Sequence, residues 1–98
     1  MAFDIFYTDK AKDTLNVVYA FITHNFSLAI ADKFIAQTEV KIKLISENPF
    51  IYKSSILDEQ IRIALINKHS SLFYQIRRDR IYLLFFWDNR QEPFFTTD

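Results

Sequence analysis

Cysteine and glycine are both absent from this chain of 98 residues. Without cysteine there can be no disulfide, no thiolate nucleophile and no zinc–thiolate site. Without glycine the chain cannot build a P-loop, a dinucleotide-binding loop or the nucleophile elbow of hydrolases, because each needs glycine for positive φ or close backbone approach. These absences exclude the common nucleotide-binding loops and all thiol chemistry.

Histidine and long apolar runs are also scarce. The two histidines, His24 and His69, do not have the spacing of a metal-binding pair, so we expect no metal site and no other cofactor. The longest apolar run, Ile81 to Trp87, has seven residues, whereas a membrane helix needs about 20. The first residues lack a basic stretch followed by an apolar one. We therefore expect neither a membrane span nor a secretory signal.

The residues that are present favour one small globular domain covering residues 1–98. Half of them are hydrophobic and 17% are aromatic, which is enough for a single core. The net charge is zero, but residues 50–90 carry seven cations against four acids, a balance of +3. All five arginines lie between positions 62 and 90. Arginine suits bidentate phosphate recognition, although the polar surface of a β-hairpin explains the same pattern.

The first half of the chain predicts a strand followed by two helices. Residues 2–8 alternate as a strand does, and Thr8 or Asp9 then supplies an N-cap. Apolar residues at spacings of three and four predict a helix that ends near residues 24–25. Ser27 is a second N-cap, and its helix ends at Asn48-Pro49, because a residue before proline leaves the α region. The short connection favours an antiparallel helical hairpin.

The second half predicts three strands, at residues 61–65, 72–77 and 81–87, with an irregular tail over residues 89–98. We expect turns at residues 67–70 and at Arg78-Asp79, in which the aspartate takes the unusual backbone angles. The order β-α-α-β-β-β indicates an α+β fold, a helical hairpin packed on a mostly antiparallel four-stranded sheet. The bulky aromatic residues are expected in its core: Phe34, Phe73, Phe85 and Trp87.

These elements resemble the RelE/ParE superfamily of toxins from bacterial type II toxin–antitoxin systems. The resemblance covers the whole chain and depends on the order and spacing of several short motifs. They are Ala11-x-x-x-Leu15, Tyr19-x-x-Ile22, Ala31-x-x-Phe34-Ile35, Leu44-x-x-x-Asn48-Pro49, Ile61-Arg62, Leu72-Phe73-Tyr74-Gln75-Ile76, and the strand from Ile81 to Trp87 followed by Arg90 and Pro93.

The resemblance implies a small cytoplasmic toxin that stops growth and is neutralised by an antitoxin encoded beside it. The RelE branch cuts mRNA in the ribosome, whereas the ParE branch is associated with poisoning DNA gyrase and lacks the nuclease residues. The resemblance also implies a toxin–antitoxin hetero-oligomer or a homodimer. An antitoxin helix or strand is expected to bind the groove of the hairpin and sheet.

Only two of the five RelE-type catalytic positions are filled. Arg62 occupies the first basic position and Arg90 the arginine after the last strand. Ala64 and Ser71 stand where the resemblance implies a second basic residue and a strand arginine, and no tyrosine follows Arg90. This departure favours a ParE-like binding toxin. The alternatives are a ribosome-dependent mRNA endonuclease that uses Arg62 and Arg90, and a degenerate member without toxicity.

Five further residues have weaker functional interpretations. Tyr74, Lys68 or His69 could carry a proton for RNA cleavage, although a tyrosine in the core or at its rim and an exposed turn explain them better. Phe94 and Phe95 in the tail are candidate antitoxin contacts, unless they fold back on the first strand. Arg62 and Arg90 could likewise be ordinary ion-pair partners of nearby acids.

Overall fold

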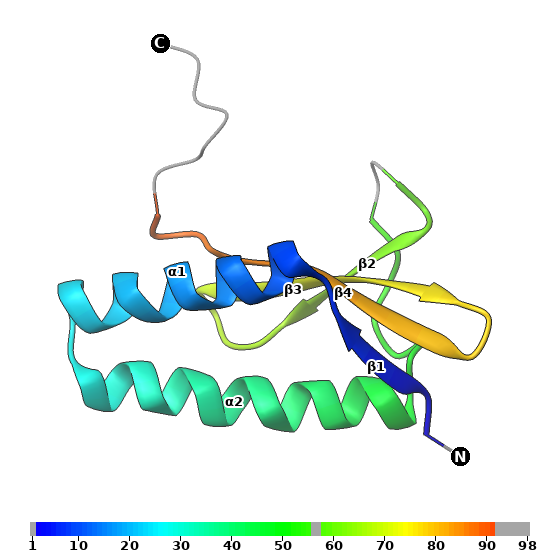
Figure 1. The fold of residues 1–98 in the computed structure, drawn as a ribbon, viewed down its shortest axis with the longest axis horizontal. Coiled ribbons are helices and arrows are strands. Elements are labelled where there is room, and N and C mark those ends of the chain that lie inside the picture. Colours follow the sequence, from blue (N-terminus) through cyan, green and yellow to red (C-terminus); the bar gives the residue numbers. More distant parts are fainter. Residues whose placement is uncertain (1, 56–57, 92–98) are drawn as a thin grey trace, which may run out of the picture.

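The computed structural model describes residues 2–55 and 58–91 of the chain (Figure 1). Its elements follow the predicted order β-α-α-β-β-β. They are β1 (Asp4–Tyr7), α1 (Asp9–Asn25), α2 (Leu28–Glu47), β2 (Ile61–Leu65), β3 (Ser70–Arg77) and β4 (Arg80–Asp88). The last two strands are longer than the apolar alternation predicts, because their polar end residues continue the backbone pairing.

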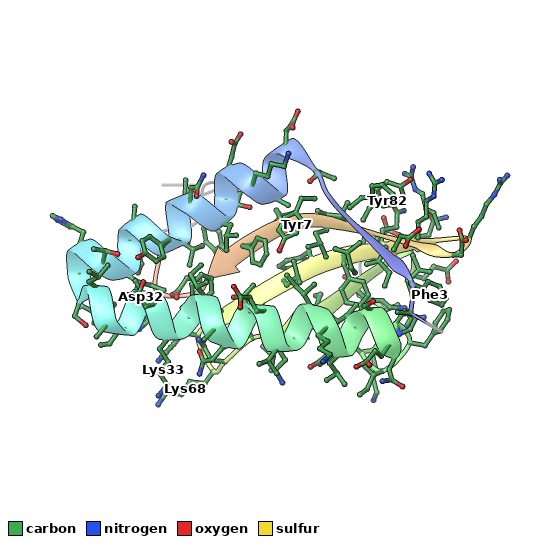
Figure 2. The ribbon with its side chains drawn as sticks, turned by 60° about the horizontal axis from the view of Figure 1, so that its bottom comes forward. Phe3, Tyr7, Asp32, Lys33, Lys68 and Tyr82 are labelled. Carbon is green, nitrogen blue, oxygen red and sulfur yellow. The ribbon has the colours of Figure 1, made fainter. Side chains whose placement is uncertain are left out.

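The four strands form one mixed sheet in the order β1-β4-β3-β2. β1 runs parallel to β4, and the other two pairings are antiparallel. Helices α1 and α2 lie side by side as an antiparallel hairpin and pack on the sheet (Figures 1 and 2). The predicted fold class, an α+β domain with a helical hairpin on a four-stranded sheet, is confirmed.

Capping hydroxyls begin both helices. Thr8, rather than Asp9, is the N-cap of α1, and its hydroxyl accepts a hydrogen bond from the amide of Ala11 at 3.0 Å. The same hydroxyl donates to the carbonyl of Leu83 in β4 at 2.7 Å, so the cap also fixes α1 to the sheet. Ser27 caps α2 by accepting from the amide of Ile30 at 3.1 Å, as predicted.

One hydrophobic core lies between the helices and the face of the sheet that they cover. Both helices and the three C-terminal strands contribute to it, and Phe34 is 1% exposed, as predicted for a core residue. The large apolar side chains that are almost fully buried are Val18, Ile22, Phe34, Ile45, Leu72, Tyr74, Ile81, Leu83 and Phe86. No helix in the described ranges has the length and apolar character that crossing a bilayer requires.

A β-bulge in β4 decides which aromatic side chains leave this core. Tyr74 pairs with Leu83 while the preceding Phe73 pairs with Phe85, so Leu84 is an extra residue on β4. The bulge reverses the alternation, which turns Phe85 and Trp87 to the opposite face. Phe73 lies on that face for another reason, since it alternates with the buried Leu72 and Tyr74 along β3. The prediction that Phe73, Phe85 and Trp87 lie in the core is wrong: all three are half-buried on the face without helices, called the open face below.

The β3–β4 hairpin turn is formed by Arg78 and Asp79, as predicted, but the unusual backbone angle is in the arginine. Arg78 has φ 59°, in the left-handed region, and it is the one non-glycine residue with positive φ in the described part of the chain. The expectation that the aspartate takes this conformation is wrong. The turn before β3 is held by the side chain of Asn67, which accepts hydrogen bonds from the amides of His69 and Ser70.

Candidate functional site

Arg90 is part of a hydrogen-bonded network at the end of β4. Its Nη2 lies 2.7 Å from Oδ2 of Asp88 and its Nε 2.9 Å from Oδ1, and its backbone amide donates to the same carboxylate. Asp88 is completely buried and also accepts a hydrogen bond from the Ser70 hydroxyl at 2.9 Å. The guanidinium lies 4.5 Å from the centroid of the Phe26 ring. Arg90 therefore connects the end of the sheet to the turn between the helices.

The protonation states of this pair follow from their contacts. Burial alone would raise the pKa of the Asp88 carboxyl, but hydrogen bonds from Arg90 and Ser70 outweigh it and lower that pKa. The hydrogen bond to Asp88 raises the pKa of Arg90. Both groups are charged at neutral pH, and neither can act as a general acid or base there.

Arg62 has a different set of partners, next to the end of α2. Its Nη1 donates to the carbonyl of Tyr52, and its guanidinium lies 5.0 Å from the centroid of the Phe50 ring. Arg62 pairs with Tyr74 and Ala64 with Leu72, which places both β2 residues on the helix-covered face. Ala64, at the second RelE-type basic position, is 0% exposed. A cation at that position would be buried in the core.

Arg62 and Arg90 do not share a site. Phe50, which contacts Arg62, follows α2, and Phe26, which contacts Arg90, precedes it. A helix of 20 residues is about 30 Å long. Two guanidinium groups that lie at its opposite ends cannot bind one phosphate between them.

Tyr74 lies in the core rather than at a surface. It is 0% exposed, and its hydroxyl donates to the carbonyl of Pro49 at 2.8 Å. Burial raises the pKa of Tyr74 to about 12, although the charge of Arg62 acts in the opposite direction. A phenol with this pKa stays protonated near neutral pH and cannot act as a general base there, which counts against the proton-carrier interpretation.

Lys68 and His69 lie in the turn between β2 and β3, at the Arg90 end of the sheet. The amide of Asn89 donates to the carbonyl of His69 at 2.8 Å, so this turn adjoins the residue before Arg90. Lys68 is exposed and His69 is half-buried. Figure 2 shows Lys68 near Lys33 and far from Tyr82, which is at the other end of the sheet. Phe94 and Phe95 lie outside the described residues.

The open face carries an aromatic cluster that the sequence did not predict there. The rings of Phe73 and Phe85 stack with centroids 4.2 Å apart and an interplanar angle of 15°. Ile63 pairs with Phe73, and Trp87 pairs with Ser71 on the same face. The seven-residue apolar run of β4 could have indicated this cluster, because such a run places apolar side chains on both faces of the sheet. A pattern of alternation alone does not show which face the helices cover.

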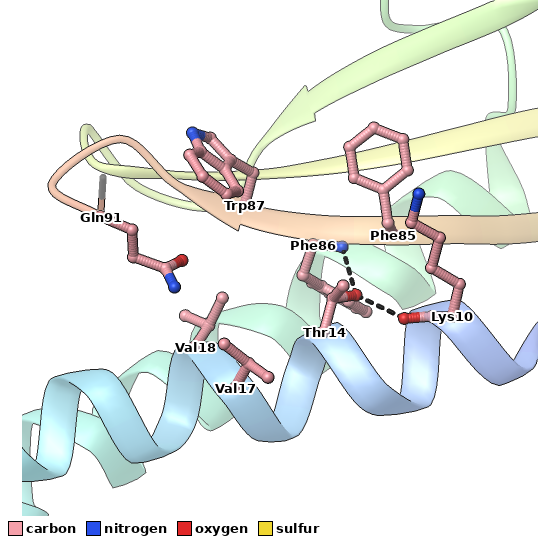
Figure 3. A pocket seen from close by; sticks show the side chains of 8 residues that line it. All are labelled: Lys10, Thr14, Val17, Val18, Phe85, Phe86, Trp87 and Gln91. Atoms are coloured by element: carbon pink, nitrogen blue, oxygen red, sulfur yellow. Dashed lines mark hydrogen bonds between the residues drawn. The ribbon is translucent and has the colours of Figure 1, made fainter. Parts of the chain in front are cut away.

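A pocket of about 300 Å³ opens between α1 and this aromatic cluster (Figure 3). Its base is fixed by Thr14, which accepts from the amide of Phe86 at 2.8 Å and donates to the carbonyl of Lys10 at 2.7 Å. The Lys10 ammonium lies 5.1 Å from the Phe85 ring centroid. The pocket is lined by Lys10, Thr14, Val17, Val18, Phe85, Phe86, Trp87 and Gln91. Such a surface suits an apolar side chain of a partner better than a phosphate.

Comparison with known proteins identifies the family and supports the fold. The family model described as "ParE toxin of type II toxin-antitoxin system, parDE" matches residues 5–93. None of the curated proteins matches the chain. The fold is similar to that of a chain of the chromosomal ParDE toxin–antitoxin system from P. aeruginosa, with 14% identity and a TM-score of 0.74. That similarity covers 89% of this chain and 96% of the other.

A second solved structure, the YoeB dimer from Staphylococcus aureus, is also similar. Its identity is 15% and its TM-score 0.61, and the match covers 87% of this chain and 94% of the YoeB chain. At these identities the two structures support the fold, while the family model identifies the kind of protein. The hairpin-on-sheet fold and the match over residues 5–93 together show that this chain belongs to the ParE toxin family of type II toxin–antitoxin systems.

Proposed function

We propose that this protein is a growth-inhibiting toxin that acts in the cytoplasm by binding a protein target, as ParE-like toxins do with DNA gyrase. Its action does not require chemistry by its own side chains. A cognate antitoxin neutralises it by covering the Trp87 end of the open face.

The observation that carries this proposal is the composition of the open face at the Ser71–Trp87 end. A metal-free ribonuclease needs a base, an acid and cations crowded around one phosphate. This end of the face instead presents the stacked rings of Phe73 and Phe85 beside Trp87. Arg62 and Arg90, the two arginines at RelE-type catalytic positions, lie apart at opposite ends of α2. These features support binding rather than catalysis.

The antitoxin segment that fits this face is an amphipathic helix. The outer edge of β2 is already occupied in part, since Ser54 forms a bridge with Arg62 and the amide of Ser55 donates to the carbonyl of Ile61. A strand added at the β2 edge would have to displace this segment. A helix lying across Phe73 and Phe85 needs no such change and can place one apolar side chain in the pocket beside α1.

The target is tested with purified protein in two reactions. We expect inhibition of DNA supercoiling by gyrase, and intact mRNA in a cell-free translation reaction analysed by primer extension. Ribosome-dependent cuts that disappear with Arg62→Ala or Arg90→Ala would instead establish the RelE-like endonuclease. If expression in cells does not slow growth and neither reaction is affected, the chain is a non-toxic member of its family.

The antitoxin surface is tested by titration calorimetry with the antitoxin from the neighbouring gene. Truncating an aromatic anchor at an interface centre costs about 2 kcal/mol or more, which is about 30-fold in Kd. We expect this loss for Phe85→Ala and Trp87→Ala. Val40→Ala is the matched control, because Val40 is 67% exposed on α2, away from the open face. Equal losses for Val40 and Trp87 would contradict the proposed surface.

The same exposed apolar face favours association of the free toxin with itself. The similar YoeB structure is described as a dimer. We expect the free protein to form a homodimer that the antitoxin converts into a hetero-oligomer, which light scattering can measure. A Trp87→Ala variant that dimerises as strongly as the wild type would place the dimer contact elsewhere.

A further inference from the structure

Four side chains form a connected row across the β3–β4 hairpin end of the open face. The Arg80 guanidinium lies 5.2 Å from the Phe6 ring centroid, the Phe6 ring stacks on Tyr82 at 5.5 Å, and the Arg77 guanidinium lies 5.4 Å from the Tyr82 ring. Phe6 pairs with Tyr82 and Arg77 with Arg80 in the sheet. The register of three strands therefore fixes this arginine–aromatic row.

The arginines of the row are oriented but retain unused donors. Arg77 Nε donates to Gln75 Oε1 at 3.0 Å, and Gln75 Nε2 donates to Gln60 Oε1 at 3.1 Å. Arg77 and Arg80 are both exposed. Within residues 2–55 and 58–91, no carboxylate forms an ion pair with either of them. Their remaining N–H groups are therefore exposed to solvent, while the ring contacts hold the two guanidinium groups in place.

Arg78 adds a third cation in an unfavourable conformation. It lies in the hairpin turn with φ 59°, a backbone conformation that glycine or asparagine adopts at a lower cost in free energy. It is exposed, and no hydrogen bond or ring contact of its side chain occurs in the described part of the chain. Backbone strain that brings no local contact is a reason to look for a function of the side chain.

Arg77 of the row also lines a hollow at the β2 edge, which Arg62 lines from the helix-covered face of the sheet. This hollow has a volume of about 470 Å³ and is lined on its cationic side by Arg62, Arg77 and Arg78. Phe50, beneath Arg62, adds another guanidinium–ring contact. Three acidic residues are also present. Glu59 lines the hollow, Asp79 is in the turn, and Asp4 lies opposite Arg80 in the pairing of β1 with β4. The four arginines outnumber these three acids, so the local charge is positive but small.

We propose that this arginine–aromatic row and the adjoining hollow bind the phosphate backbone of a single-stranded nucleic acid. Guanidinium forks donate two hydrogen bonds to one phosphate, and guanidinium planes and aromatic rings accept stacked bases. The carboxylates of an acidic peptide would accept hydrogen bonds from the guanidinium groups, but they would not stack on the guanidinium planes or the aromatic rings. The row therefore favours a nucleic acid. This site is at the opposite end of the sheet from the pocket beside Trp87, and it does not depend on the proposed function.

The test is fluorescence anisotropy with labelled oligothymidylate and oligouridylate of about 12 nucleotides. Single strands release about 0.7 counterion per phosphate contact, so contacts by Arg77, Arg78 and Arg80 predict a slope of about −2 in log Kobs against log salt. Arg77→Ala and Arg80→Ala should each reduce that slope by about 0.7. Equal affinity for the two strands would assign recognition to the shared backbone, and a preference would identify RNA or DNA as the ligand.

Two kinds of variant keep this test decisive. Arg78→Asn removes a cation and suits the left-handed turn, so it should fold at least as well as the wild type and bind more weakly. Lys33→Ala and Lys68→Ala remove the same charge far from Tyr82 (Figure 2) and should leave the slope unchanged. Any of three results would overturn the proposal: no binding at low salt, equal effects of the lysine controls, or equally strong competition by polyglutamate, which would indicate an acidic protein partner.

Duplex DNA and the antitoxin complete the experiment. Tighter binding of a duplex of the same length would reject the single-stranded assignment. Antitoxin affinity should be unchanged by Arg78→Asn, because the proposed antitoxin surface is at the other end of the sheet. Failure of nucleic-acid binding with intact antitoxin binding would reject this inference alone and leave the proposed function standing.

Discussion

The guanidinium of Arg90 donates two hydrogen bonds, of 2.7 and 2.9 Å, to the buried carboxylate of Asp88. The backbone amide of Arg90 binds the same carboxylate, and Ser70 supplies a further donor. Since Asp88 is fully buried and Arg90 lies on the Phe26 ring, this pair holds the end of β4 against the helical hairpin. We therefore interpret Arg90 as a residue that stabilises the fold.

Removing the acid should therefore destabilise the protein. Asp88→Asn leaves Arg90 without its charged partner. Because 25% of the Arg90 side chain is exposed to water, we expect a loss of about 2 kcal/mol, less than for a pair buried on both sides. Urea unfolding followed by circular dichroism measures this loss. Asp13→Asn, at an exposed position of α1, is the control and should change stability by less than about 0.5 kcal/mol.

The same pair predicts the acid dependence of stability. The folded-state pKa of Asp88 is lowered, so its contribution is complete above its unfolded pKa of about 4 and is lost as pH falls through the lower folded value. The difference between wild type and Asp88→Asn should shrink below about pH 4. A difference that stays constant from neutral pH to pH 2 would show that the ion pair contributes nothing.

Tyr74→Phe separates a structural from a chemical role of the buried phenol. Loss of the hydrogen bond to the Pro49 carbonyl should cost about 1 kcal/mol, with no change in toxicity. The pKa of Tyr74 is raised to about 12 in the folded state, so wild-type stability should fall as pH rises above about 10, the unfolded value. Tyr74→Phe should lose less stability over that range. Abolished toxicity in a fully folded Tyr74→Phe protein would restore the proton-carrier interpretation.

Arg62 and Arg90 should act independently. Sites more than about 10 Å apart without shared partners have additive effects, so the double variant Arg62→Ala/Arg90→Ala should lose the sum of the single losses within about 0.5 kcal/mol. Denaturant unfolding of the wild type, the two single variants and the double variant measures the free energies of unfolding that this double-mutant cycle compares. A coupling energy above about 1 kcal/mol would mean that the two arginines communicate.

The two helix caps provide a matched comparison. Ser27 makes one capping bond, whereas Thr8 also donates to the carbonyl of Leu83 in β4. Ser27→Ala should cost about 1 kcal/mol and Thr8→Ala about 2 kcal/mol, because Thr8→Ala also removes one of the hydrogen bonds between the start of α1 and the sheet. Equal shifts of the urea midpoint for both variants would show that the bond to Leu83 adds no stability.

The sequence by itself determined the order of the elements and the limits of the helices. Capping by Thr8 and Ser27, and the end of α2 before Pro49, depend on local hydrogen bonding and on φ restrictions, which neighbouring residues fix. The helical periodicity that placed Phe34 in the core is also local. Because these features need no long-range contact, they could be predicted, and together they carried the resemblance to the toxin superfamily.

The tertiary structure alone decided which face each strand residue occupies. The bulge at Leu84 arises from the pairing of β3 with β4, two strands whose register no local pattern fixes, and it moved Phe85 and Trp87 from the expected core to the open face. Pairing likewise placed Arg62 on the covered face. The packing of the hairpin set Arg62 and Arg90 at opposite ends of α2, so the phosphate site that their presence in the sequence suggested does not form.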